Sequence, residues 1–388
     1  MARQHNILFI TPWFPHQENP IEGIFIKNHA KAVTLRDRVV VLHLIGARKD
    51  IPFFGHLEKI PTSDHNDEIP IYQLTWKLVP LPNLTYLLYL ISVIRAVRRI
   101  IADGFKPDIL HAHVYTAGVS TIVISRLFHI PALITEHSSA FIRNLLPQRE
   151  ILKARSAFKR AQYVLPVSMA LQKAIQSYGI QANFQIVSNS VDPDLFYPLS
   201  KTDKSKLKHI LFVGSLLPIK GIPTLIRALH LVIRRRDDWR LEIVGEGPLR
   251  PELERLASVL GLENHIRFHG LISTREVAEH MHRANFFILP SESETFSVVI
   301  AEALASGLPV ITTRCGGPEE LIDDTNGIFV PVGNVEALAD AIQWMLDNLE
   351  YYSPMTIAKN AVARYGQDAV GKRLHSLYID TLNLCDHA

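Results

Sequence analysis

The sequence predicts an α/β protein of two domains, each built on a doubly wound parallel sheet. Short apolar or β-branched runs alternate with longer helical patterns, which is typical of strands joined by crossover helices. The chain has 388 residues, and one hydrophobic core usually stops growing at about 250 to 300 residues. Apolar residues make up 47% of the chain, so it can fill two sizeable cores.

The first domain is predicted to cover residues 1–195 and to be followed by a linker at 196–208. Its expected strands are Ile7–Ile10, Val39–Leu44, Ile71–Trp76, Ile109–His113, Ala132–Thr135, Tyr163–Val167 and Gln185–Ser188. From 189 to 208 the sequence is rich in Asp, Pro, Ser and Lys and has neither a helical nor a strand period. This composition is typical of an irregular connection.

The second domain is predicted to cover residues 209–367. Its expected strands are His209–Val213, Leu241–Val244, Ile266–Phe268, Phe286–Leu289 and Pro309–Thr312. A final helix is expected at about 368–388, and packing against the first domain is one alternative for it. Ligands of such sheets bind beyond the carboxyl ends of the strands, so two such domains facing each other would share one cleft.

Composition and termini indicate a cytoplasmic protein. Cys315 and Cys385 are the only cysteines, too few for a disulfide framework or a cysteine zinc site. Residues Met1–Asn6 lack the pattern of a secretory signal. The longest apolar run, Leu84–Ala96, is interrupted by polar residues and is shorter than the roughly 20 residues of a spanning helix.

The two halves of the chain differ in charge. Residues 1–200 carry 21 Lys and Arg against 14 Asp and Glu, whereas residues 201–388 carry 20 against 24. The basic half predicts contact with an anionic partner, such as the inner face of the plasma membrane, through Arg95, Arg98 and Arg99. The alternative for the charge is a solvated basic face, and the alternative for the arginine-containing segment is an ordinary core-packed helix. Nucleic acid is not expected, because no binding motif accompanies the charge.

The strongest functional signal lies in Ser291–Val310, where Glu294 and Glu302 are separated by seven residues. If a helix begins near Phe296, Glu294 lies in the preceding loop and Glu302 lies well inside the helix. Carboxylates cannot bind phosphate, but they accept hydrogen bonds from sugar hydroxyls. The alternative is that Glu294 caps the helix while Glu302 faces solvent.

The start of the same helix is a candidate anion site. The free amides of Phe296, Ser297 and Val298, together with the positive end of the helix dipole, favour a diphosphate. A sugar nucleotide offers the matching groups: a diphosphate for the amides, a ribose diol for Glu302 and a transferred sugar for Glu294.

A second loop, Phe212–Gly221, follows the first strand of the second domain. Its Lys220 would place a positive charge beside a leaving diphosphate. Taken alone, Lys followed by Gly after a strand is usually only a helix start.

These two segments resemble the signature motifs of retaining glycosyltransferases of family 4 (glycosyl transferases group 1), which have the GT-B fold. The resemblance implies two Rossmann-like domains facing across a cleft. The family's Gly-Phe-Gly is Thr295-Phe296-Ser297 in this sequence, and the Arg of its Gly-Arg-Leu phosphate loop is Ser215, after Gly214. Replacing that Arg removes a bidentate donor to the diphosphate.

The resemblance assigns further site residues. Glu294, Lys220 and His137 would be catalytic, with the neutral His137 imidazole bonded to a sugar hydroxyl. His111 and His113 form the family's H-x-H strand end, where His113 implies acceptor contact; too few ligands surround the pair for a metal. The predicted donor-binding residues are Gly23, Gly214, Ser215, Lys220, His269 through its backbone, Thr295, Phe296, Ser297, Val298 and Glu302.

The function predicted from this resemblance is sugar transfer from an NDP-sugar, such as a UDP-sugar, to a hydroxyl of a glycan, lipid-linked or small-molecule acceptor. The nucleotide sugar is a co-substrate, and no cofactor or metal is expected. A same-face mechanism, in which the leaving phosphate takes the acceptor proton, is the hypothesis for retention. The alternatives are a GT-B nucleotide-sugar epimerase and a non-catalytic nucleotide-sugar-binding protein.

Overall fold

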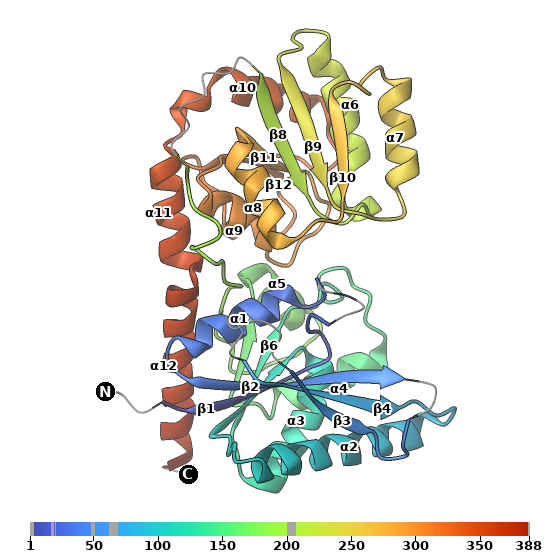
Figure 1. Cartoon of the computed structure of the whole chain (residues 1–388), viewed down its shortest axis with the longest axis vertical. Helices are drawn as coiled ribbons and strands as arrows, with labels where there is room; N and C mark the ends of the chain where they lie inside the picture. The colour runs from blue at the N-terminus through green and yellow to red at the C-terminus, as the bar shows by residue number, and fades with distance from the viewer. Residues whose placement is uncertain are drawn as a thin grey trace. The chain divides into compact units, whose positions relative to one another are not determined.

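The computed structural model describes residues 4–16, 19, 21–47, 51–61, 69–199 and 207–386. The chain forms two compact α/β units (Figure 1). Unit 1 combines Met1–Ser190 with Gln367–Ala388, and unit 2 is Val191–Gly366. The sequence placed a linker at 196–208, of which residues 200–206 lie outside the described residues.

Unit 1 contains a seven-stranded sheet in the order β3-β4-β2-β1-β5-β6-β7, parallel except for β3. The strands are β1 (Asn6–Thr11), β2 (Arg38–Ala47), β3 (His56–Ile60), β4 (Ile71–Lys77), β5 (Ile109–His113), β6 (Ala132–Glu136) and β7 (Tyr163–Pro166). The strand predicted at Gln185–Ser188 is wrong. That segment only donates two backbone hydrogen bonds to β7, from Gln185 and Val187, without forming a regular ladder.

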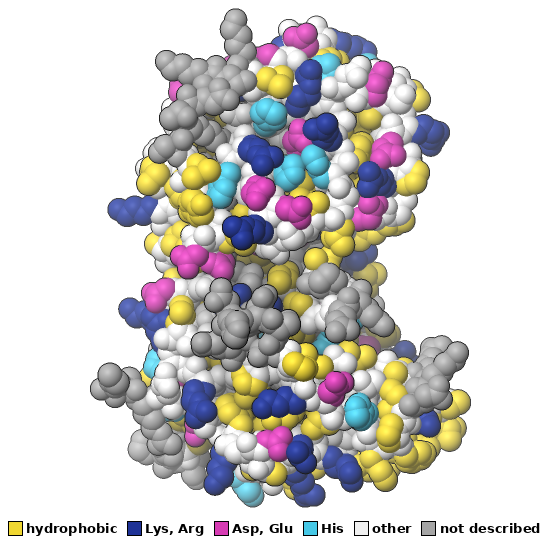
Figure 2. All heavy atoms as spheres, in the orientation of Figure 1, with side chains coloured by type: hydrophobic (Ala, Val, Ile, Leu, Met, Phe, Trp, Pro, Cys, Tyr) yellow, Lys and Arg dark blue, Asp and Glu magenta, His cyan; other side chains and the backbone are white. Residues whose placement is uncertain are grey.

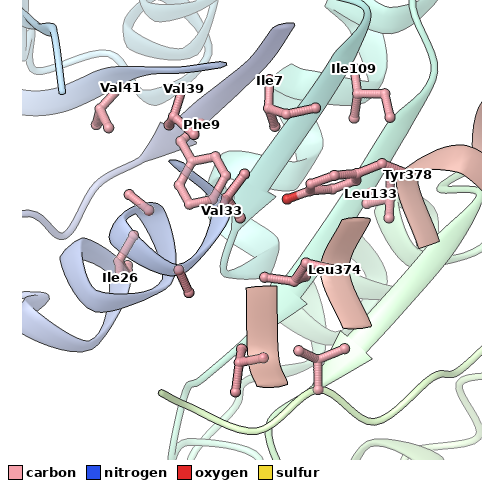
Figure 3. Close-up of a cluster of buried hydrophobic side chains, with 14 of the residues drawn as sticks. Ile7, Phe9, Ile26, Val33, Val39, Val41, Ile109, Leu133, Leu374 and Tyr378 are labelled. Atoms are coloured by element: carbon pink, nitrogen blue, oxygen red, sulfur yellow. The ribbon is translucent and has the colours of Figure 1, made fainter. Parts of the chain in front are cut away.

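The helices of unit 1 are α1 (Ile24–Thr34), α2 (Pro82–Ala102), α3 (Tyr115–Phe128), α4 (Gln148–Phe158), α5 (Met169–Ser177) and α12 (Gln367–Asp386). Helix α12 comes from the far end of the sequence and supplies Leu374 and Tyr378 to the core beneath β1 and β5 (Figure 3). Both side chains are fully buried. The first unit therefore depends on a segment that follows the whole of unit 2 in sequence.

Unit 2 contains a six-stranded parallel sheet in the order β10-β9-β8-β11-β12-β13. The strands are β8 (Lys208–Val213), β9 (Trp239–Val244), β10 (Ile266–Gly270), β11 (Phe286–Leu289), β12 (Val310–Thr313) and β13 (Gly327–Val330). The helices are α6 (Ile222–Ile233), α7 (Arg250–Val259), α8 (Thr274–Arg283), α9 (Val298–Ala305), α10 (Val335–Asp347) and α11 (Pro354–Tyr365). Short 3-10 turns occur at Pro218–Lys220, Gly317–Glu320 and Leu349–Tyr351.

In each sheet the strand order reverses once, between β1 and β5 in unit 1 and between β8 and β11 in unit 2. Open α/β sheets bind ligands at the carboxyl ends of the strands beside such a reversal. The loops after these strands are therefore the places to examine for chemistry. Separately, among the described residues no helix combines the length and apolar character needed to cross a bilayer.

Candidate functional site

Lys220 and Glu294 meet at the point of strand reversal in unit 2. The Lys220 Nζ donates to Glu294 Oε1 over 2.6 Å, and the Ser291 hydroxyl donates to the same oxygen over 2.7 Å. The two side chains are only 20% and 10% exposed. The structure thus joins two predicted site residues that lie 74 positions apart in the sequence.

Backbone contacts hold these two loops together. Gly221 has φ 67°, and a Cβ there would lie 2.0 Å from the carbonyl oxygen of Pro290. Only glycine permits this approach of the loop after β8 to the loop after β11. Glu294 is fixed on its other side, because its amide donates to the carbonyl of Cys315 and its carbonyl accepts from the amide of Gly317.

Helix α9 begins at Val298, two residues later than the predicted start near Phe296. Of the three predicted amides, only that of Val298 therefore belongs to the first turn of the helix. The N-cap residue, Ser297, makes no side-chain cap hydrogen bond, which leaves the amides at this helix start free for an anion. Phe296 is buried and packs edge-on against Tyr365.

Ser297 has a strained backbone, with φ 76° and ψ 83°. Its buried hydroxyl has no hydrogen-bond partner among the described residues. The Ser297→Gly variant should therefore be more stable by about 1 kcal/mol, since glycine adopts positive φ without strain. Urea unfolding would measure the gain, and Ser297→Ala is the control because it removes the hydroxyl but keeps the Cβ. Equal stability of the two variants would contradict backbone strain as the cause.

Glu302 lies in the middle of α9 and is only 7% exposed. Its carboxyl makes no ion pair or hydrogen bond with another described residue. Burial raises the pKa of Glu302 to about 8. The alternative that Glu302 faces solvent is therefore wrong. A buried carboxyl without a partner is available to a ligand that brings hydroxyl groups.

The remaining predicted donor residues occupy the ends of neighbouring strands. Gly214 and Ser215 follow β8, where Ser215 is exposed, and Thr295 lies between Glu294 and the start of α9. His269 lies in β10, and its side chain contacts Glu242 of β9. The predicted role of His269 uses its backbone, so this side-chain contact leaves that prediction open.

His113 and His137 lie at the ends of the adjacent strands β5 and β6 of unit 1. The Nδ1 of His113 is 3.1 Å from the Nε2 of His137, and the two rings stack. His29 of α1 is the third member of the cluster, with its ring 5.6 Å from that of His137. The sequence did not point to His29, because a histidine in an amphipathic helix gives no local sign of a partner 108 residues away.

These three histidines are neutral, and two of them are incompletely satisfied. Burial lowers the pKa of His29 to about 4 and holds the pKa values of His113 and His137 well below the usual range. The Nε2 of His29 bonds the Ser188 carbonyl over 2.8 Å. Two buried ring nitrogens, His29 Nδ1 and His113 Nε2, have no hydrogen-bond partner among the described residues. Buried polar atoms of this kind normally bind a ligand or a water molecule. Neutral ring nitrogens can bind the hydroxyl groups of a sugar.

Glu136 organises this end of unit 1 and was not predicted. One of its carboxylate oxygens accepts hydrogen bonds from the amides of His137 and Ser138, and the other accepts from the amide of Tyr115. Burial raises the pKa of Glu136 to about 7 although these three amides favour its ionised form. The residue before Tyr115 is Val114, whose φ of 63° and ψ of 150° are strained for a β-branched residue.

His111 has a structural role in the core of unit 1. Both ring nitrogens of His111 are occupied, by the hydroxyls of Tyr378 and Thr135 at 2.7 Å. Acceptor contact by His111 is therefore excluded, and of the two histidines of the H-x-H strand end only His113 remains for that role.

Gly23 has φ 62°, and a Cβ there would lie 2.4 Å from the Trp13 carbonyl oxygen. This close packing within the loop explains the glycine; phosphate contact stays a prediction.

Unit 1 also contains a pocket of about 580 Å³ at the carboxyl ends of β1, β2 and β4. The aromatic side chains in its lining come from the loop after β1, from β4 and from α2. Trp76 and Tyr89 pack against each other with ring centroids 4.8 Å apart. Its aromatic and charged lining residues include Trp13, Trp76, Tyr86, Tyr89, Glu22 and Lys153.

Comparison with known families follows the division into two units. The family described as "Glycosyltransferase Family 4" matches residues 59–195, and the family described as "Glycosyl transferases group 1" matches residues 207–348. The first match includes His113 and His137, and the second includes Lys220, Glu294 and Glu302.

Individual proteins are similar over most of the chain. A D-inositol 3-phosphate glycosyltransferase of Pseudarthrobacter chlorophenolicus is 28% identical over 295 residues, 70% of each chain. An uncharacterised glycosyltransferase of Methanocaldococcus jannaschii is 28% identical over 317 residues, which cover 80% of this chain and 84% of the relative. The Anabaena protein HepE, in a crystal structure with UDP and glucose, has the same fold with a TM-score of 0.76, at 22% identity over 97% of this chain and all of its own.

Proposed function

We propose that this chain, a GT-B glycosyltransferase of the family 4 type, transfers a sugar from a nucleoside diphosphate sugar to an acceptor hydroxyl with retention of configuration. The observation that carries the proposal is the Lys220–Glu294 pair beside the uncapped start of α9. A cation and free amides suit a diphosphate, and a carboxylate suits the hydroxyls of the attached sugar. Because HepE is seen with UDP and glucose, a UDP-sugar is the first donor to try.

In the proposed reaction, the bond between the anomeric carbon and the phosphate oxygen breaks as the acceptor oxygen attacks from the same face. The acceptor proton passes to the departing phosphate, so no protein nucleophile or metal takes part. Lys220 and the start of α9 stabilise the charge that grows on the phosphate. Glu294 orients the sugar, Glu302 accepts from the ribose hydroxyls, and the neutral His137 bonds a sugar hydroxyl.

Product analysis tests this function. The full chain would be screened with UDP-, GDP- and ADP-sugars for thermal stabilisation and then incubated with glycan, lipid-linked and small-molecule acceptors. Release of NDP with a lengthened product that keeps the anomeric configuration supports the proposal. An epimerised nucleotide sugar without NDP would establish the epimerase instead, and stabilisation without turnover on any acceptor would leave a binding protein.

The pocket of unit 1 is the proposed acceptor site. Aromatic faces contact the apolar face of a sugar ring, while Glu22 and Lys153 at the same pocket offer polar partners. Trp76→Ala should raise the acceptor KM about tenfold or more, because an aromatic contact contributes about 1.5–3 kcal/mol. Stabilisation by the donor should not change. Trp344→Ala, at a half-exposed tryptophan of unit 2, is the control, and an unchanged acceptor KM in Trp76→Ala would reject this site.

Peripheral contact with anionic membrane is proposed for the surface around α2. Arg95, Arg98 and Arg99 line a pocket of about 640 Å³ that also contains Lys59 and Phe54. The same helix exposes Leu87, whereas its buried residues Val93, Val97 and Ile100 pack into the core. An anionic surface with apolar depth fits these groups.

The expected result is cosedimentation with phosphatidylserine vesicles at low salt and release at high salt. The Arg95→Ala/Arg98→Ala double variant should bind several-fold more weakly, whereas Arg235→Ala, an exposed site on unit 2, should bind like the parent. Failure to bind anionic vesicles at low salt would remove the membrane proposal without affecting sugar transfer.

A further inference from the structure

A cluster of metal-ligating side chains lies in unit 2, and these side chains play no part in the reaction proposed above. Glu242 of β9, His269 of β10 and His280 of α8 bring one ligand atom each to within 4.8 Å of one another. Glu242 and His269 are in direct contact, and the His280 ring centroid is 4.4 Å from that of His269. Three different elements therefore converge on one point.

A fourth candidate ligand comes from β8. The Nδ1 of His209 is 3.9 Å from the second carboxylate oxygen of Glu242. In the parallel ladder His209 pairs with Arg240, two residues before Glu242, so the two side chains share a face of the sheet. The cluster consists of one carboxylate and up to three imidazoles.

We infer that Glu242, His269 and His280 bind a transition-metal ion, with Zn²⁺ as the expected occupant and His209 or water as the fourth ligand. Two or three imidazoles with one carboxylate suit zinc, whereas magnesium and calcium prefer oxygen ligands throughout. Tetrahedral zinc with bonds of about 2.0–2.2 Å holds neighbouring ligand atoms roughly 3.3 Å apart. The observed spacing needs only a small side-chain adjustment to reach that value.

The solvent exposure of the cluster and the free ring nitrogen of His280 both support a bound ion. The side chains of Glu242, His269 and His209 are 18%, 21% and 37% exposed, so an ion can enter from solvent. Figure 2 shows histidine and acidic side chains gathered on the visible face of unit 2. His280 makes no ring hydrogen bond to another described residue, which leaves a lone pair free. An ion bound here would link α8 to β9 and β10, and also to β8 when His209 is the fourth ligand.

The test is Zn²⁺ titration of the full chain after removal of metal with a chelator. Calorimetry should show one tight site per chain, and Zn²⁺ in hundredfold excess over Kd should raise the Tm by roughly 5–10 °C. Co²⁺ should give the visible absorption of a four-coordinate nitrogen and oxygen site. His280→Ala and the isosteric Glu242→Gln should each lose at least about tenfold in affinity.

His29→Ala is the matched control, because His29, His113 and His137 form the other histidine cluster whose ring nitrogens lie within 4.8 Å of one another. This variant should keep the tight site. Equal Zn²⁺ affinity in the parent, His280→Ala and Glu242→Gln would overturn the inference, as would loss of binding only in His29→Ala. Sugar transfer is measured separately, so its failure would leave the metal site standing.

Discussion

Lys220→Ala should lower the turnover number by about 10²–10³-fold, since removing one group that stabilises the developing charge typically has this effect. Lys220 is the cation joined to Glu294, over 2.6 Å, at the strand reversal of unit 2. Glu294→Ala should cost a similar factor if the carboxylate orients the transferred sugar. Initial rates of NDP release at saturating donor and acceptor would measure both effects.

Two further variants separate charge from geometry and folding. Lys220→Arg keeps the positive charge but replaces a compact ammonium by a planar guanidinium, so it should recover only part of the rate. Lys359→Ala removes an exposed lysine from α11 and should turn over normally. Because loss of one partner of a partly buried pair also destabilises the fold, each variant is assayed well below its own Tm. Turnover of Lys220→Ala within threefold of the parent would disprove the assigned role.

Glu302→Gln should make the protein more stable at alkaline pH while weakening donor binding. Burial raises the folded-state pKa of Glu302 to about 8 from its usual value of 4.5. Between these values the folded state holds a proton that the unfolded state has lost, so the free energy of unfolding falls as the pH rises through this range. Above pH 8 the folded chain carries a buried carboxylate without a partner.

Glutamine removes this titration, so the variant should exceed the parent by a few kcal/mol at pH 9 and match it near pH 4. Urea unfolding at several pH values measures the difference, and Glu252→Gln, on the exposed face of α7, should show none. At pH 9, where the parent carboxyl is ionised, donor affinity should fall about tenfold or more, because a charged acceptor of the ribose hydroxyls is lost. If the difference in unfolding free energy between the parent and Glu302→Gln stayed constant from pH 5 to pH 9, the carboxyl of Glu302 could not be buried and unpaired.

Much of the fold could be predicted from sequence because the central strands are buried on both faces. Phe286–Leu289, for example, is continuously apolar and forms β11 with those same bounds. Two of the four edge strands gave a weaker signal. His56–Ile60 has only two apolar residues, and none of its five residues is buried. Gly327–Val330 begins with glycine, which is depleted in strands. Neither β3 nor β13 was predicted.

The parts of the site that escaped prediction depend on contacts distant in sequence or on backbone conformation. Glu136 looks like one polar residue at a strand end, and its bond from the Tyr115 amide, 21 residues earlier, exists only once α3 and β6 are adjacent. Ser297 has a left-handed conformation that delays the start of α9, although serine gives no sign of it. Lys220 and Glu294 were found because each lies in the loop after a strand and in a motif specific enough to identify its family.

The position of α12 reverses the order in which the two units can mature during synthesis. Unit 2 is one continuous segment, Val191–Gly366, and it can fold as soon as it has left the ribosome. The earlier-made unit must wait for Leu374 and Tyr378 to fill its core, so its apolar surface stays open in the meantime. A nascent chain halted after Gly366 would thus carry a finished second half and an unfinished first half.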